Sequence, residues 1–198
     1  MLGMFKNKYP LFCLGVYIIA FVIGAIKPWY FHDWILESFL PILIVLALVF
    51  TYRKFRFSNT SYTLILIYLI FHTIGSHYTY LNMPFTENLF GLERNYYDRF
   101  VHFLFGLFMY FPIIELCKQF LKKKSECYYA IIAISAIVTL GFLFELLEGL
   151  VYLFFRNTEV IEAYLAAQGR NVLEDSFYDV FVKFIGSLIS AGFAYIRK

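Results

Sequence analysis

Six apolar stretches, separated by shorter polar segments, run along this chain. A helix that crosses a membrane needs about 20 mostly apolar residues, within a usual range of roughly 17–25. None of the stretches shows the polar and apolar alternation of a barrel strand, and a helix satisfies its own backbone hydrogen bonds in lipid. The pattern predicts an all-α, polytopic membrane protein with one integral membrane domain over residues 1–198. The six transmembrane helices of this bundle are expected over residues 10–26, 35–52, 61–81, 98–117, 127–155 and 175–196.

Composition supports a membrane protein, because 61% of the residues are hydrophobic and only 16% are charged. A soluble domain carries about 25% charged residues. The net charge of +3 is too small to indicate nucleic-acid binding, so membrane lipids are the expected partners. Lys6 and Lys8 before the first stretch resemble the start of a signal peptide, but no small-residue cleavage pattern follows, which favours a retained helix. Protein partners and the oligomeric state stay open.

Basic residues gather in alternate connections, and such residues mark the cytoplasmic side of a membrane protein. One set comprises Lys6, Lys8, Arg53, Lys54, Arg56, Lys118, Lys122, Lys123, Lys124, Arg197 and Lys198. The opposite set comprises only Lys27, Arg94, Arg99, Arg156 and Arg170. We therefore expect both termini in the cytoplasm. Cys13, Cys117 and Cys127 fall near cytoplasmic helix ends, where thiols stay reduced, so we expect neither a disulfide nor a cysteine metal site.

Ionisable residues inside or beside the apolar stretches are the main functional signal. A charged side chain at the membrane centre costs about 2.5–3.5 kcal/mol on insertion scales, so such residues usually pair or function. With the predicted topology they fall in the extracytoplasmic half: His77, Asp98, His102, Glu145, Glu148, Asp175 and Asp179. Glu37, near the outer start of its helix, is a further candidate. His72 lies deeper, and we assign it to packing or an interhelical hydrogen bond.

Several of these residues lie close together in the sequence, and such pairs also have a structural interpretation. Asp98 and Arg99 are also explained as interfacial charges. Asp179 and Lys183 are one helical turn apart and are expected to neutralise each other. Glu145 and Glu148 are harder to explain, because two carboxylates one turn apart repel unless a proton, a cation or a metal lies between them.

Two motifs add a resemblance. The runs Gly75-Ser-His77-Tyr78-Thr-Tyr80 and Asn95-Tyr-Tyr97-Asp98-Arg99-Phe-Val-His102-Phe103 resemble the YjdF-like family of bacterial inner-membrane proteins, a domain of unknown function. The paired glutamates and the later aspartates match the same family over nearly the whole chain. The chain departs after Gln168-Gly169, where the aspartate expected directly after the glycine is missing. The last helix is also weakly similar to VanZ-like proteins. The resemblance implies the bacterial inner membrane and names no activity.

The first functional hypothesis is metal-dependent chemistry on a lipid-linked or outer-leaflet substrate. Imidazole and carboxylate ligands suit Zn, Mn or non-haem Fe, and such a metal activates water or polarises a phosphoryl or acyl group. The metal candidates are His77, Asp98, His102, Glu145, Glu148, Asp175 and Asp179. The catalytic candidates are Asp98, Arg99, His102, Glu145 and Glu148. Arg99 would hold a phosphate head group, because a guanidinium binds phosphate in a bidentate manner. The spacing matches no established metalloenzyme motif.

Two alternatives stay open. The polar groups either fix helix packing in a structural or accessory protein, as buried ion networks can, or serve a small transporter. A transporter is disfavoured because the ionisable groups gather in one leaflet and no inverted repeat is present in the sequence.

Overall fold

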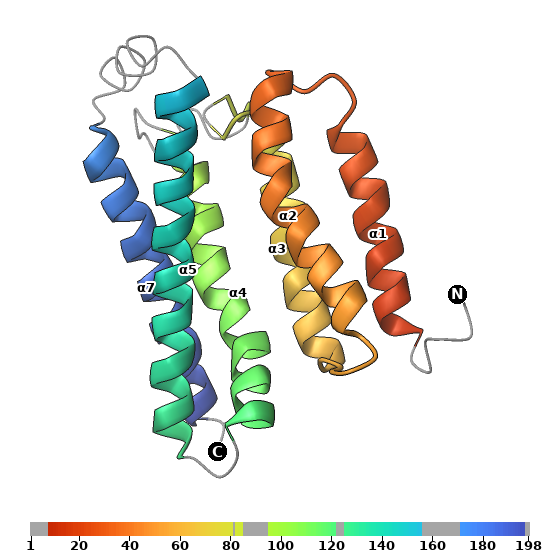
Figure 1. Ribbon diagram of the computed structural model, residues 1–198, viewed down its shortest axis with the longest axis vertical. Helices are drawn as coiled ribbons and strands as arrows, with labels where there is room; N and C mark the ends of the chain where they lie inside the picture. The colour runs from red at the N-terminus through yellow and green to blue at the C-terminus, as the bar shows by residue number, and fades with distance from the viewer. Residues whose placement is uncertain (1–7, 81, 85–94, 122–124, 156–170, 197–198) are drawn as a thin grey trace. The chain divides into compact units, whose positions relative to one another are not determined.

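The computed structural model describes residues 8–80, 82–84, 95–121, 125–155 and 171–196, which form helices and no strand. The helices, in the labels of Figure 1, are α1 (Tyr9–Gly24), α2 (Phe31–Thr51), α3 (Asn59–His77), α4 (Tyr97–Phe120), α5 (Glu126–Phe155) and α7 (Val172–Ile196). The all-α prediction is confirmed. The chain divides into two compact units, Met1–Val101 and His102–Lys198, and the division falls inside α4.

Short polar side chains begin several helices, as the sequence chemistry requires. Ser58 caps α3 by accepting a hydrogen bond from the backbone nitrogen of Ser61 at 3.1 Å. Ser125 accepts from Tyr128 at 3.2 Å at the start of α5, and Asn171 accepts from Leu173 at 3.0 Å at the start of α7. These contacts satisfy N–H groups that have no partner within the helix.

The two largest errors in the predicted helix boundaries are four residues each. α3 ends at His77 and not at residue 81, because Thr79 and Tyr80 adopt left-handed backbone angles (φ 55° and 56°) that turn the chain back toward α3. α2 begins at Phe31 and not at residue 35: Tyr30 is extended and Asp33 lies in the first turn, where the helix dipole favours a negative charge. Trp34 therefore belongs to α2, and its ring packs against Phe21 of α1 at 5.3 Å between centroids.

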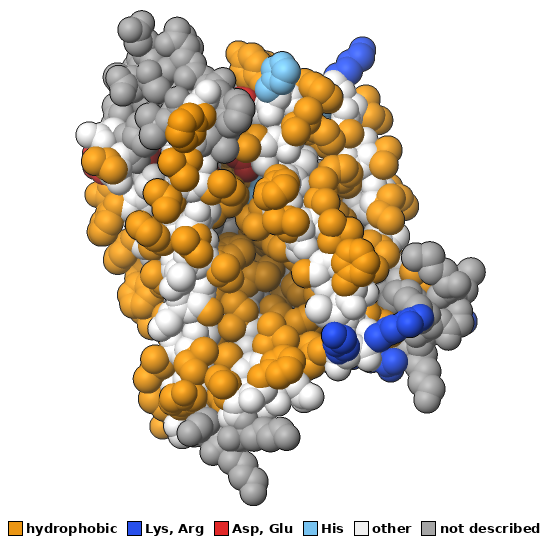
Figure 2. Space-filling model, in the orientation of Figure 1, with side chains coloured by type: hydrophobic (Ala, Val, Ile, Leu, Met, Phe, Trp, Pro, Cys, Tyr) orange, Lys and Arg blue, Asp and Glu red, His pale blue; other side chains and the backbone are white. Residues whose placement is uncertain are grey.

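Four of the described helices are long and apolar enough to cross a membrane: α2, α4, α5 and α7. α1 is apolar but has 16 residues, whereas α3 has 19 residues and carries many polar ones. Figure 2 shows hydrophobic side chains over most of the visible helix surfaces, with Lys and Arg toward helix ends. Large apolar side chains such as Phe142 and Leu143 of α5 are more than half exposed, an arrangement that suits helices facing lipid.

Within the first unit, α3 packs against both α1 and α2. Cys13, Tyr52 and Tyr62, one from each of the three helices or its end, form a buried cluster. All three cysteines of the chain are free.

Within the second unit, glycines bring α4 and α7 into backbone contact. A Cβ atom added to Gly106 would overlap the carbonyl oxygen of Lys183, and one added to Gly186 would overlap that of Phe103. Ser190 donates a hydrogen bond to the carbonyl of Leu107 across the same contact. α5 packs along α7, so side chains from three helices can meet over a short distance.

Candidate functional site

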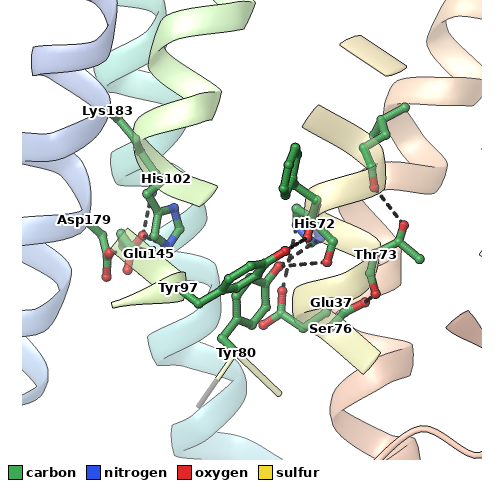
Figure 3. A network of polar contacts seen from close by, with 12 residues as sticks. Glu37, His72, Thr73, Ser76, Tyr80, Tyr97, His102, Glu145, Asp179 and Lys183 are labelled. Atoms are coloured by element: carbon green, nitrogen blue, oxygen red, sulfur yellow. Dashed lines mark hydrogen bonds and ion pairs between the residues drawn. The ribbon is translucent and has the colours of Figure 1, made fainter. Parts of the chain in front are cut away.

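His102, Glu145 and Asp179 converge within the second unit from α4, α5 and α7 (Figure 3). Nε2 of His102 lies 3.4 Å from Oδ1 of Asp179 and 4.0 Å from Oε1 of Glu145. Glu145 and Asp179 are buried, with 9% and 3% of their surface exposed. A protonated imidazole would therefore neutralise buried carboxylates, and a neutral imidazole would offer Nε2 to a metal beside them.

Lys183 supplies the permanent positive charge of this cluster. Its Nζ lies 2.6 Å from Oε1 of Glu145, and only 2% of the residue is exposed. The prediction that Lys183 pairs with Asp179 on its own helix is wrong, because the ammonium reaches across to α5. Gly141 makes room for it: a Cβ there would lie 2.7 Å from Cδ of the lysine. The sequence indicated that a proton, a cation or a metal lies beside the paired glutamates. For Glu145, that cation is the ammonium of Lys183.

Asp98 and Arg99 occupy the first turn of α4, and Asp98 precedes His102 by one helical turn. Asp98, His102 and Asp179 each offer one ligand atom, and these atoms lie within 4.8 Å of one another. Arg99 is buried, and its Nη1 lies 3.7 Å from Oδ2 of Asp98. Two carboxylates and one imidazole at this separation form a donor set that suits a divalent metal.

The other metal candidates from the sequence are not members of this three-ligand group, and of these Glu145 contacts His102 as described above. Nδ1 of His77 bonds the carbonyl oxygen of Gly24 at 2.9 Å, which ties the end of α3 to the end of α1. Asp175 lies in the first turn of α7, where the helix dipole favours it. Glu148 is half-buried one turn after Glu145, outside the group of Asp98, His102 and Asp179.

A second polar network lies within the first unit, and sequence reasoning identified its members only in part. Nδ1 of His72 lies 2.9 Å from the hydroxyl of Tyr80, and Nε2 lies 3.9 Å from Oε2 of Glu37 (Figure 3). His72 is buried, as its predicted packing role requires, but its hydrogen bond goes to the turn after its own helix, and its contact with α2 is the 3.9 Å approach to Glu37. The sequence placed Glu37 as a possible member of the other cluster and assigned Tyr80 no role. The sequence signal that could have identified Tyr80 was Gly75, five residues before it.

The family motifs have a clear structural purpose in this unit. The ring of Tyr80 lies over Gly75, where any Cβ would overlap it. The amide of Asn95 donates to the carbonyl of Tyr80 at 3.0 Å and accepts from the backbone nitrogen of Tyr97 at 2.9 Å. Tyr97 in turn donates from its hydroxyl to the carbonyl of Phe71 at 2.9 Å. These contacts, the α3–α4 clasp, fasten the first turn of α4 to α3. Gln168 and Gly169, where the chain departs from the motif, lie outside the described residues.

Comparisons with known proteins identify the family of this chain. Residues 9–198 match the family described as "Predicted membrane protein (DUF2238)". The chain is 26% identical over 168 residues to the inner membrane protein YjdF of Escherichia coli (strain K12), which covers 82% of this chain and 78% of the relative. No solved structure matches the chain. The chain therefore belongs to the DUF2238 family of predicted membrane proteins, as the resemblance predicted.

Proposed function

We propose that this protein is a six-span protein of the bacterial inner membrane that carries out metal-dependent chemistry on a lipid-linked or outer-leaflet substrate. The inner-membrane location is supported by the relative YjdF and by four helices long and apolar enough to span. The six-span arrangement with cytoplasmic termini rests on the distribution of Lys and Arg. Its test is a pair of reporter fusions: a fluorescent protein at the C-terminus should fluoresce, and alkaline phosphatase at the same position should be inactive.

The observation that carries the chemistry is the grouping of Asp98, His102 and Asp179. Their ligand atoms lie within 4.8 Å of one another, and two oxygens with one nitrogen suit Zn, Mn or Fe. When bound, such a metal would activate water or polarise a phosphoryl or acyl group.

The surrounding residues have supporting roles in this proposal. Lys183 holds Glu145 at 2.6 Å and so keeps one carboxylate neutralised without using the imidazole. Arg99, beside Asp98, provides a buried guanidinium whose planar geometry suits a phosphate group. The guanidinium of Arg99 therefore suits a lipid-linked substrate that bears a phosphate.

The test is the metal content of protein purified in mild detergent and loaded in turn with Zn, Mn or Fe(II). We expect about one metal ion per chain in the wild type and a loss of most of it in His102→Ala and Asp179→Asn, because each variant removes one of three ligands. Exposed residues of similar types provide controls: His32→Ala and Glu174→Gln should keep the wild-type metal content. Equal metal content in folded wild type and site variants, or no metal in any of them, contradicts the proposal.

An accessory or structural protein is the second candidate, and the buried Lys183–Glu145 pair favours it. Such pairs can specify how helices pack without any chemistry. In that case His102→Ala and Asp179→Asn would lower thermal stability alone, with no metal bound to the wild-type protein.

A further inference from the structure

The interior of the first unit contains an acid–base chain that the candidate metal site does not use. His72 of α3 is 3% exposed and stands between two other titratable side chains, Glu37 of α2 and Tyr80 of the turn after α3. The neighbouring titratable groups include Tyr68, whose ring meets that of His72 edge-on at 5.6 Å, and Tyr97, whose ring lies 6.3 Å from that of Tyr80. The carboxylate of Asp98 also acts electrostatically on Tyr80. A glutamate and a histidine buried in a membrane protein are expensive unless they pair or work.

The geometry orders these three groups in a line. The imidazole meets the Tyr80 hydroxyl through Nδ1 at 2.9 Å, which is a hydrogen bond. Its other nitrogen, Nε2, faces the Glu37 carboxylate at 3.9 Å, a separation that one water molecule can bridge. A ring proton on Nε2 is favoured by the carboxylate, and Nδ1 is then free to accept the proton of the phenol. Tyrosine, histidine and glutamate thus have the arrangement in which an imidazole takes a hydroxyl proton while a carboxylate orients it.

A second observation concerns buried polar atoms on α2. Among the described residues, the side-chain atoms Trp34 Nε1 and Ser38 Oγ are buried and have no hydrogen-bond partner in the protein. They lie one turn apart on α2, within a turn of Glu37, and Ser38 is only 4% exposed. Buried polar atoms without a protein partner are usually satisfied by ordered water. Polar groups that require water therefore lie on α2 within one turn of Glu37.

We propose that Glu37, His72 and Tyr80 form a proton relay within the first unit, and this proposal does not depend on the metal site. In one passage the phenol proton of Tyr80 moves to Nδ1 of His72, while the proton on Nε2 moves, through a bridging water, to Glu37. The imidazole stays neutral with its proton on the other nitrogen, Glu37 becomes a neutral acid, and the phenol oxygen of Tyr80 takes a proton from solvent as its own proton leaves, so that no phenolate is left in the interior. The net result is one proton carried from solvent at Tyr80 to Glu37.

Nitrogen NMR of the imidazoles tests the relay, since the chain has 4 histidines. The full chain would be labelled with ¹⁵N-histidine, purified in detergent and assigned by replacing each histidine with Gln. We expect His72 to carry its proton on Nε2 in the wild type. In Tyr80→Phe, exchange of that proton with solvent should slow by roughly 100-fold, since a positioned acid–base group contributes about 10²–10⁴ to a proton transfer.

The matched control is Tyr97→Phe, which removes a phenol hydroxyl from the same α3–α4 clasp without touching the imidazole. It should leave the exchange of the His72 proton unchanged. Glu37→Gln keeps the size of the side chain and should slow the exchange as Tyr80→Phe does, which provides the same test without altering the turn. A proton found on Nδ1, an unchanged rate in Tyr80→Phe or Glu37→Gln, or an equal slowing in Tyr97→Phe would overturn the proposal.

Discussion

The two polar clusters of this protein neutralise buried charge in different ways. In the second unit, the Glu145 carboxylate directly contacts the Lys183 ammonium at 2.6 Å. In the first unit, Oε2 of Glu37 lies 3.9 Å from Nε2 of His72, an imidazole that is charged only when protonated. A fixed ion pair holds its charges in place, whereas a chain of hydrogen-bonding acid–base groups lets a proton move. We therefore propose different roles for the two clusters: a positioned, charged site in the second unit and a proton relay in the first.

Both clusters depend on glycines, but different kinds of atoms occupy the space beside those glycines in the two units. In the second unit the backbone of α7 occupies the space beside Gly106, and a backbone cannot move without shifting the helix. In the first unit the ring of Tyr80 occupies the space over Gly75, and a side chain can rotate away. Substitutions in the second unit are therefore expected to cost more stability than equivalent substitutions in the first.

The largest effect is expected from Lys183→Met. It leaves Glu145 buried without its cation, and breaking a buried pair costs about 3–5 kcal/mol. The free energy of unfolding in detergent measures the loss. The double variant Glu145→Leu with Lys183→Met should recover most of it, because an apolar pair replaces an ionic one. A single variant as stable as the wild type would show that the ion pair does not hold the helices.

The next effect is expected from Gly186→Ala in α7. The added Cβ would meet the backbone of α4, so overpacking should lower the free energy of unfolding by about 1–3 kcal/mol. Gly192→Ala in the same helix is the control, since no atom lies within 4 Å of its added Cβ. That variant should be neutral or more stable by up to about 1 kcal/mol, as alanine favours a helix. Equal stability of the two variants would contradict the close approach of α4 and α7.

A smaller effect is expected from Gly75→Ala in the first unit. The methyl group would displace the ring of Tyr80 and break its hydrogen bond with His72, at a cost of about 1 kcal/mol. Gly15→Ala in α1 is the control, because its added Cβ meets open space. Thermal unfolding measures stability, and the ¹⁵N signal of His72 should shift in Gly75→Ala alone. An unchanged His72 signal would mean that Tyr80 does not bond the imidazole.

The smallest effect is expected from Lys118→Ala. Nζ of Lys118 lies 3.0 Å from Oε2 of Glu126, but both side chains are nearly half exposed. A surface pair of this kind contributes about 0–1 kcal/mol and is screened by salt. The change in unfolding free energy of Lys118→Ala should be a small fraction of the change in Lys183→Met. The two variants thus compare a lysine–glutamate pair at the surface with one in the interior. A loss as large as that of Lys183→Met would contradict this distinction.

The sequence predicts the helices well, because long apolar stretches leave few alternatives in a membrane. It fails where local backbone geometry decides: the left-handed angles of Thr79 and Tyr80 end α3 early, and no apolar pattern encodes them. It also fails where side-chain reach decides. Spacing along α7 pairs Lys183 with Asp179, whereas the packing of α5 against α7 gives the lysine to Glu145.

The candidate site could be predicted as a set of residue types and not as a set of contacts. His102, Glu145 and Asp179 stand out because ionisable residues are rare in apolar stretches, and they lie together in the structure. His77 stands out for the same reason, yet it bonds the backbone carbonyl of Gly24. Tyr80 has no such signal, because tyrosine is common throughout this chain, with 17 in all.

The most direct test of the proposed function is an experimental structure of protein loaded with Mn or Zn, with the metal located by anomalous scattering. The account predicts one peak bonded to a ring nitrogen of His102 and to carboxylate oxygens of Asp98 and Asp179, at about 2.0–2.2 Å. It also predicts that Lys183 stays on Glu145. A fully loaded crystal with no peak at these three residues, or with its only peak elsewhere, would contradict a metal centre at this position.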